Sequence, residues 1–405
     1  MIGSGDVMYA SNINKIVLIN FFQRFHLYIH AYALLLLGRG LTLVQISLIE
    51  SIVIGTIFLM EVPTGVLADR VGRKWSIFAS TFLLMSAEFI FIFARGFEWY
   101  VFIALLTGTG FAFASGAMEA MIYDSLPEKG REDAMKRVMG RVNSFAQIAF
   151  VIAPILGGLI IGDAAVENFI PAIVLTVLAL LLGLFVCLTL REPSIETTDS
   201  AGKKAGSVTL LRDGLSLLLT QPHLRWLALL VVFTSPFTGA MVTILGPPYL
   251  VQNEVSPFVI GITLSLGSLL AALTQRYAYK VEEWLGQARA IALLILAPGA
   301  LYWVLAGVAG PVAPVLVIIL MYGVNDMKAP LFSAYQNALI ESKNRATVLS
   351  MISMFLSMFL ALGLPVYAAL AQRSLSLTFV VMGAVIVLAG LLLGVHRLTE
   401  AENRG

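Results

Sequence analysis

The chain has 405 residues, of which 59% are hydrophobic and only 12% are charged, and its formal net charge is +2. About a quarter of the residues in a soluble domain are charged, so this composition excludes a soluble enzyme, a disordered regulator and a nucleic-acid binder. The mean hydropathy of +0.90 is typical of a polytopic membrane protein. The single cysteine, Cys187, can form neither an internal disulfide nor a thiolate metal cluster.

Long apolar segments follow one another along the chain. A helix needs about 20 mostly apolar residues to cross the hydrocarbon core of a bilayer. Twelve segments meet this condition: Lys15–Leu37, Leu43–Ala68, Trp75–Arg95, Glu98–Asp124, Met139–Gly162, Val166–Leu190, His223–Leu250, Pro257–Lys280, Ala288–Val308, Pro311–Glu341, Ala346–Gln372 and Leu375–Val395. The predicted fold class is therefore an all-α polytopic membrane protein with twelve transmembrane helices.

The basic residues predict the orientation of these spans, because cytoplasmic loops are enriched in Lys and Arg. When the connections are assigned alternately to two sides, 21 of the 26 basic residues fall on the side of the N-terminus. Three fall on the other side, and Arg24 and Lys328 remain inside spans. We therefore expect a multi-pass protein of the cell's inner (plasma) membrane with both termini in the cytoplasm. The polar N-terminal segment does not resemble a cleaved signal peptide.

The longest connection predicts the domain organisation: a six-helix bundle at 1–190, a cytoplasmic linker at 191–222 and a second bundle at 223–405. The linker begins as a Ser-, Thr-, Gly- and Lys-rich tether, and its leucines at 210–219 favour either a short amphipathic surface helix or a continued tether. Asp69 and Gly72 follow the second span, and Glu283 and Gly286 follow the eighth, 214 residues later. This repetition suggests duplicated halves, as in transporters that rock two bundles around a site at the membrane midplane.

The connection after the second span has the most specific pattern in the chain. Residues 65–74 read Gly-Val-Leu-Ala-Asp-Arg-Val-Gly-Arg-Lys. Gly65 is expected to allow close helix packing and Gly72 a tight turn. Asp69 is expected to face the N-terminus of the third span, where an anion is favoured. Arg73 should reach Asp124 at the end of the fourth span.

This loop resembles the signature loop of the major facilitator superfamily, and the twelve spans and central linker extend the resemblance over essentially the whole chain. In that family the loop latches the two halves in the outward-open state. The resemblance implies a conformational latch formed by Gly65, Asp69, Arg70, Gly72, Arg73, Lys74 and Asp124.

The fifth span resembles the family's antiporter motif. It contains Gly140, Pro154, Gly157 and Gly158, and alanine stands in place of two further glycines of that motif. The resemblance implies exchange of a drug or metabolite for protons. A small-residue packing face without any bearing on transport direction is the alternative. The arginine that drug exporters of the family carry in the fourth span is absent, because that position is Ala104.

Ionisable residues at membrane depth are costly and therefore indicate function. Helical spacing places Arg24 and Tyr28 on one stripe of the first span, and His26 and His30 on another. In the family, the first, fourth, seventh and tenth spans line the central cavity. The resemblance therefore implies a substrate cavity lined by Arg24, Tyr28, Ser115, Tyr123, Tyr322 and Asn337.

Two carboxylates, Glu119 in the fourth span and Asp326 in the tenth, are our candidates for proton coupling. A carboxylate held away from water can be neutralised by a proton or paired with a cation, so proton binding and ion pairing compete. A permanent ion pair, for instance between Arg24 and Glu119, is the alternative. Helix–helix hydrogen bonding is favoured over metal binding for the two histidines, Glu88 is interpreted as structural, and Lys328 has no assigned partner.

We expect a secondary active transporter that exports a small amphipathic compound or drug in exchange for protons. A proton-coupled importer of a small metabolite is the alternative. No enzyme motif for metal-dependent hydrolysis, serine hydrolysis or phosphate binding occurs, so we expect no enzymatic activity. The expected partners are a small-molecule substrate, protons and the lipid bilayer, with no metal or cofactor, and a monomer is expected.

Overall fold

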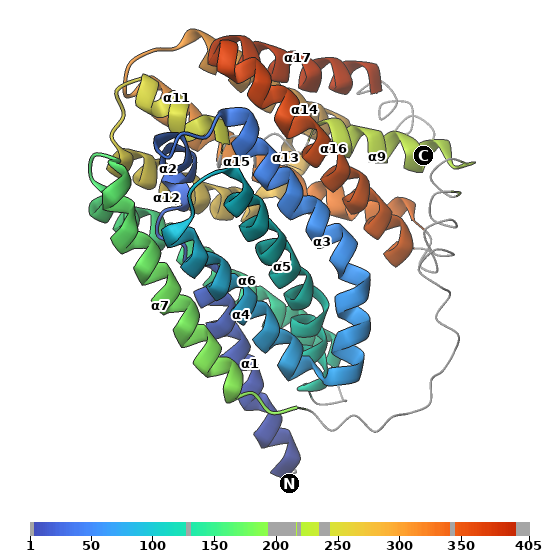
Figure 1. Ribbon diagram of the computed structural model, residues 1–405. Coiled ribbons are helices and arrows are strands. Elements are labelled where there is room, and N and C mark those ends of the chain that lie inside the picture. Colours follow the sequence, from blue (N-terminus) through green and yellow to red (C-terminus); the bar gives the residue numbers. More distant parts are fainter. Residues whose placement is uncertain are drawn as a thin grey trace. The chain divides into compact units, whose positions relative to one another are not determined.

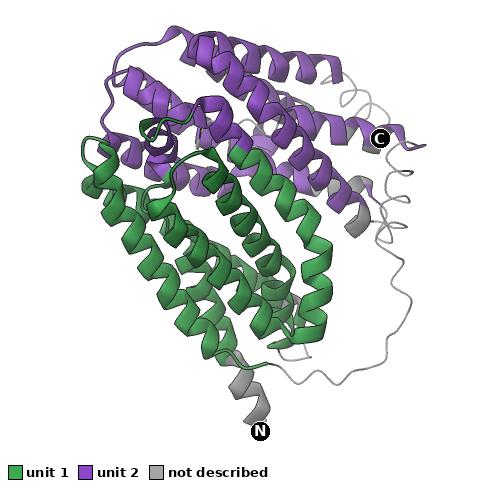
Figure 2. Cartoon of the chain, in the orientation of Figure 1, with its two compact units in different colours: residues 1–29, 38–41, 49–202 green, residues 30–37, 42–48, 203–405 purple. Residues whose placement is uncertain are grey.

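The structure is a computed structural model, and it describes residues 4–126, 131–192, 216, 220–234, 244–340 and 345–393 (Figure 1). The chain divides into two compact units, coloured separately in Figure 2. Unit 1 comprises Met1–Ile29, Gly38–Leu41 and Ile49–Gly202. Unit 2 comprises His30–Leu37, Thr42–Leu48 and Lys203–Gly405. The proposed linker helix at 210–219 lies almost wholly outside the described residues, apart from 216.

The helices of the first half are α1 (Ser4–Arg24), η1 (Ile29–Ala31), α2 (Tyr32–Gly38), α3 (Leu43–Val71), α4 (Arg73–Phe93), α5 (Phe97–Asp124), α6 (Arg131–Ile161), η2 (Val166–Asn168) and α7 (Phe169–Leu188). Within unit 1, α4 packs against both α5 and α7, and α1 packs against α6 and α7. The core of this unit gathers fully buried side chains such as Ile16, Ile77 and Met121. This packing fixes α1 and α4 relative to each other through α7.

The helices of the second half are α9 (Pro222–Thr234), α11 (Gly246–Gln252), α12 (Pro257–Arg276), α13 (Ala278–Leu285), α14 (Gln287–Gly307), α15 (Ala313–Leu339), α16 (Arg345–Arg373) and α17 (Leu375–Leu393). Within unit 2, α12 packs against α15, α14 against α17, and α9 against α16 and α17. The contact of α14 with α17 repeats that of α4 with α7 in the first half.

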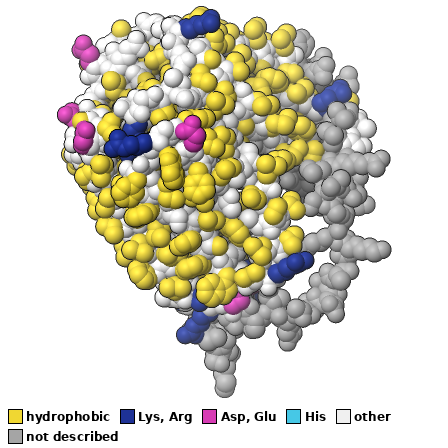
Figure 3. All heavy atoms as spheres, viewed as in Figure 1, with side chains coloured by type: hydrophobic (Ala, Val, Ile, Leu, Met, Phe, Trp, Pro, Cys, Tyr) yellow, Lys and Arg dark blue, Asp and Glu magenta, His cyan; other side chains and the backbone are white. Residues whose placement is uncertain are grey.

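Ten helices in the described part of the chain are long and apolar enough to cross a membrane. Hydrophobic side chains cover most of the surface in Figure 3, as expected when lipid and not water faces the protein. These helices coincide with ten of the twelve predicted spans. The first and seventh spans are the exceptions: the first is divided into shorter helices, and the seventh is only partly described.

The first span is interrupted after Arg24 and resumes at Ile29. In the seventh span, the described residues form α9, as far as Thr234, and α11, from Gly246, and residues 235–243 between them lie outside the described range. These two spans occupy the same place in their halves. Interrupted helices expose backbone groups at membrane depth, where only protein or a cavity can satisfy them.

A second repeated feature supports the predicted duplication. Gly72 precedes α4 with φ of 103°, and Gly286 precedes α14 with φ of 76°. Both glycines adopt the left-handed backbone region that side chains disfavour, and both helices have 21 residues. The tight turn predicted at Gly72 is confirmed, and its counterpart stands at the same place in the other half.

Candidate functional site

The loop between α3 and α4 joins several elements of unit 1. The guanidinium of Arg73 forms an ion pair with Asp124 and donates a hydrogen bond to the carbonyl of Ala120 at 2.7 Å. Lys74 donates to the carbonyl of Leu188 at 2.8 Å. The predicted contact of Arg73 with Asp124 is therefore present, and it ties the start of α4 to the ends of α5 and α7.

The anion at the N-terminus of α4 is one that the sequence interpretation missed. The carboxylate of Glu192 accepts hydrogen bonds from the backbone N–H groups of Arg73 and Lys74, at 2.7 and 2.8 Å. Asp69 is the residue predicted to face this helix start, and the two backbone N–H groups donate to Glu192. Glu192 follows α7, so it reaches the start of α4 only after the chain has passed through α5, α6 and α7.

Other expected features of the loop divide in the same way. Arg70 is exposed in the last turn of α3. A Cβ added to Gly65 would meet no atom within 4 Å, so the expected close packing at Gly65 is not found in this structure. Gly140 on α6 is equally open, whereas Gly157 and Gly158 are buried next to Pro154, which lies inside the same helix.

Two histidine-bearing segments that were expected on one helix lie in different units. Because α1 ends at Arg24, the stripe expected to join Arg24 to Tyr28 does not form. Arg24 is exposed, whereas Tyr28 is buried and donates a hydrogen bond to Glu88 at 2.6 Å. His26 approaches the other oxygen of the same carboxylate at 3.2 Å. His30 belongs to unit 2.

His30 is 1% exposed, and both its ring nitrogens lack a hydrogen-bond partner among the described residues. It lines a small space together with Tyr322 of α15 and residues of α11 and α12. Gly267 of α12 faces the ring of Tyr322, since a Cβ there would come within 2.6 Å of it. Tyr322 is therefore held by close packing inside unit 2.

The predicted site residues of α5, Ser115, Glu119 and Tyr123, lie toward the end of this helix. The part of α5 before these residues packs closely on α3. A Cβ on Gly108 would lie 2.6 Å from Thr56, and the hydroxyl of Thr64 donates to the carbonyl of Ala112 at 3.2 Å. Ser115 and Glu119 are exposed. Tyr123 is half-exposed, and the guanidinium of Arg131 lies 4.9 Å from its ring centre. Only the part of α5 from Ser115 onward can therefore face a solvent-filled cavity.

On α15 the structure supplies the partner that Lys328 lacked. Lys328 is 3% exposed, and its ammonium group donates a hydrogen bond to the carbonyl of Thr234 at 2.8 Å. Asp326 is half-buried two residues earlier. The side chain of Asn337 lies outside the described residues. Thus α15 brings a buried basic side chain to the last described residue of α9.

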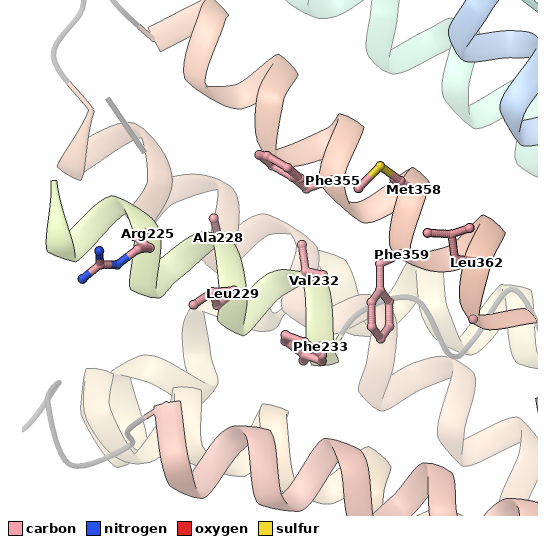
Figure 4. A pocket seen from close by; sticks show the side chains of 10 residues that line it. Arg225, Ala228, Leu229, Val232, Phe233, Phe355, Met358, Phe359 and Leu362 are labelled. Carbon is pink, nitrogen blue, oxygen red and sulfur yellow. The ribbon is translucent and has the colours of Figure 1, made fainter. Parts of the chain in front are cut away.

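A groove runs between α9 and α16 in unit 2 (Figure 4). Its volume is about 530 Å³, and its lining is apolar apart from one charged residue. The lining consists of Arg225, Ala228, Leu229, Val232 and Phe233 on α9, and Phe355, Met358, Phe359, Leu362 and Gly363 on α16. The rings of Phe233 and Phe359 meet edge to face at 4.9 Å and close one end. Arg225 stands at the other end of the row on α9.

Comparisons with known proteins agree with this architecture. The family model described as Major Facilitator Superfamily matches residues 16–339. Multidrug resistance protein 1 of Bacillus subtilis (strain 168) is 25% identical over 271 residues, covering 66% of this chain and 65% of that protein. Multidrug resistance protein 2 of the same organism has the same identity and coverage. The matched region thus spans slightly less than two thirds of each relative's length.

Solved structures share the fold at low sequence identity. The nucleoside transporter NupG superimposes with a TM-score of 0.76 at 12% identity, covering 96% of this chain and 98% of that one. A D-xylose–proton symporter gives a TM-score of 0.72 at 14% identity, covering 95% and 97%. The all-α membrane fold predicted from the sequence is confirmed by these likenesses and by the apolar helices.

Proposed function

Because the chain belongs to the major facilitator superfamily of transporters, we propose that it exports a small amphipathic organic compound in exchange for protons. The proposal places the protein in the plasma membrane with both termini in the cytoplasm, acting as a monomer. The basic residues on the side of the termini support this orientation. The names of its Bacillus subtilis relatives support export of drug-like compounds.

The groove between α9 and α16 is the observation that carries the substrate class. Ligand pockets for drug-sized molecules have volumes of about 300–1,000 Å³ and mostly apolar walls, and this groove has both properties. Arg225 and Phe233 are separated by eight residues, or about 12 Å along α9. An amphipathic molecule that places its apolar part against Phe233 would bring its polar end near Arg225. The cation favours a negatively charged or hydrogen-bond-accepting end.

Proton coupling is assigned to Glu119 and Asp326. Glu119 is exposed on α5, where protons can reach it, and Asp326 is half-buried on α15 near the buried Lys328. A half-buried carboxylate can exchange a proton for another partner during the cycle. The loop with the Arg73–Asp124 pair would act as the conformational latch. Pro154 lies inside α6, and this helix would bend there during the exchange of substrate for protons.

The test uses purified protein in liposomes with an imposed pH gradient of either sign. The probes are two fluorescent amphipaths, the anionic anilinonaphthalene sulfonate and the cationic ethidium. An exporter moves dye against the proton flow, whereas the alternative importer moves dye with it. We expect opposite movement and a preference for the anionic probe. If no gradient moves either dye, or if dye and protons move together, proton-driven export is wrong.

Variants test the assigned residues. Glu119→Gln and Asp326→Asn should each abolish gradient-driven movement, and full activity in both would refute the coupling assignment. Met358→Trp fills the groove and should weaken dye binding, whereas Val366→Trp is the matched control, because Val366 is exposed on the same helix outside the groove. Equal binding by the two tryptophan variants would remove the groove from the substrate path.

A further inference from the structure

The interruption of the first span is stabilised by contacts that a continuous helix would not need. Between Arg24 and Ile29 the backbone leaves the α-helical pattern. The freed N–H of Leu27 donates to the hydroxyl of Thr176 on α7 at 3.2 Å. The side chain of Gln23, just before the break, donates to Thr81 on α4 at 2.8 Å. The break is thus held from two neighbouring helices.

Three side chains meet at this break. The two oxygens of the Glu88 carboxyl group lie 3.2 Å from Nδ1 of His26 and 2.6 Å from the hydroxyl of Tyr28. The second ring nitrogen of His26, Nε2, lies 3.1 Å from the backbone carbonyl oxygen of Gln23. The side chains of His26 and Glu88 are only 20% and 13% exposed. His26 therefore bridges the last turn of α1 to a carboxyl group on α4.

The contacts of the His26 ring require one more hydrogen-bond donor than neutral His26 and ionised Glu88 together can supply. A carbonyl oxygen and an ionised carboxylate only accept hydrogen bonds, whereas a neutral imidazole offers one N–H donor and one acceptor nitrogen. Neutral His26 and ionised Glu88 therefore cannot satisfy both contacts of the ring. One additional proton satisfies them, either on His26 as an imidazolium or on Glu88 as a carboxylic acid that donates to Nδ1.

We infer that His26 and Glu88 form a proton-binding site that controls the break in the first span. When the extra proton is bound, both contacts of the ring are hydrogen bonds. When the proton leaves, one contact becomes two acceptors facing each other, either at Glu88 or at the Gln23 carbonyl. An unmade hydrogen bond in a buried place is unfavourable, so deprotonation releases His26 from one side of the break.

The surrounding titratable groups leave this pair as a separate site. In the portion of the chain that the structure describes, His26 is the basic side chain within ion-pair distance of Glu88. Arg39 is directed elsewhere, donating to the carbonyl of Phe91 at 2.8 Å and to the hydroxyl of Tyr100 at 3.1 Å. Arg24, on α1, is exposed. The ring of Tyr28 stacks on Phe91 at 5.5 Å, which holds its hydroxyl toward Glu88.

This site deepens the proposed proton-coupled transport, and so it rests on that function for its role but not for its existence. Glu119 and Asp326 would exchange protons with the substrate path, while the His26–Glu88 site would set the shape of the first span. A direct measurement of the proton separates the two questions.

The measurement is nuclear magnetic resonance of isotope-labelled histidine rings and glutamate carboxyl groups in the full-length protein in lipid nanodiscs at neutral pH, with Glu88 assigned by its loss in Glu88→Gln. His26 is assigned by its loss in His26→Gln. We expect the wild-type protein to hold one proton more than neutral His26 and ionised Glu88, and Glu88→Gln to convert His26 into a neutral ring with its proton on Nε2. Wild-type His26 that is neutral while Glu88 is ionised would overturn the inference, whether or not the variant folds.

Transport in liposomes tests the role. Glu88→Gln should lose dye accumulation driven by the pH gradient while keeping downhill movement of the dye, because the first span no longer responds to protons. Tyr100→Phe is the matched control, since it removes a buried hydrogen bond to the carbonyl of Ala94 and leaves the His26–Glu88 pair intact, and it should retain coupling. If Glu88→Gln keeps full coupling in a protein that is itself driven by pH, the proposed role is wrong. If the wild-type protein is not driven by pH, the proposed function fails while the proton measurement still stands.

Discussion

The ammonium group of Lys328 lies 2.8 Å from the carbonyl oxygen of Thr234, the last residue of α9. The C-terminal end of a helix carries a partial negative charge and carbonyls without partners. Lys328 therefore ties α15 to the described end of α9. A cation buried in this way at membrane depth is expensive, which points to a role in transport and not in stability.

Replacing Lys328 separates these two roles. Burying an ion costs several kcal/mol of lost hydration, whereas a hydrogen bond that involves a charged group returns about 1.5–3 kcal/mol. We expect Lys328→Met to leave the thermal unfolding midpoint in detergent unchanged or higher, and to abolish transport of the dyes. A clearly lower midpoint would show that Lys328 is a structural residue.

The ion pair between Arg73 and Asp124 is predicted to make a small contribution to the free energy of unfolding. Both side chains retain about a fifth of their exposure, 19% and 21%, and partly exposed pairs contribute about 0.2–1 kcal/mol because solvent screens them. Asp124→Ala should cost this amount. Arg73→Ala should cost more, because it also removes the hydrogen bond to Ala120. Equilibrium unfolding of both single variants and the double variant measures the coupling, and strictly additive losses would contradict it.

The carboxylate of Glu192 is predicted to stabilise the start of α4. Removing a side chain that caps a helix N-terminus costs about 0.5–2 kcal/mol, so Glu192→Ala should lower the free energy of unfolding by that amount. Glu192→Gln keeps one acceptor oxygen and should cost less. The difference between the two variants should shrink at high salt, because the charge term is screened. If Glu192→Ala left the free energy of unfolding unchanged, the contact would not contribute to stability.

The contact between α14 and α17 depends on glycine. A Cβ on Gly383 would come within 2.7 Å of the Gly299 carbonyl and of the Trp303 ring. Gly383→Ala should therefore separate the helices and cost about 1–3 kcal/mol, the usual cost of overpacking. Gly116→Ala on α5 is the control, because a Cβ there meets nothing within 4 Å, and it should stabilise by up to about 1 kcal/mol through helix propensity. Similar midpoints for the two variants would refute close packing at Gly383.

Hydropathy was sufficient to predict most of the fold. A span needs only length and apolar composition, so ten predicted spans coincide with continuous helices. The turn at Gly72 and the Arg73–Asp124 contact also followed from local sequence, since a glycine and two charges at helix ends leave few arrangements. These features depend on residues whose partners lie on the next one or two helices.

The break in the first span could not be predicted in the same way. Residues 23–30 contain neither glycine nor proline. The break is held by distant residues, because Thr176 accepts the freed N–H of Leu27 and Glu88 accepts the side-chain hydroxyl of Tyr28. Arg24 and Tyr28 would share one face only on a continuous helix, so the prediction that they do was wrong.

The position of Glu192 has a practical consequence for anyone who divides this polypeptide. The long connection predicted to begin at residue 191 is the obvious place to divide the chain or to insert a reporter protein. Here the first half borrows its helix cap from the beginning of that linker. A split or an inserted fluorescent protein should therefore lie beyond Glu192, because a junction placed directly after α7 would leave the first half without the carboxylate that starts α4.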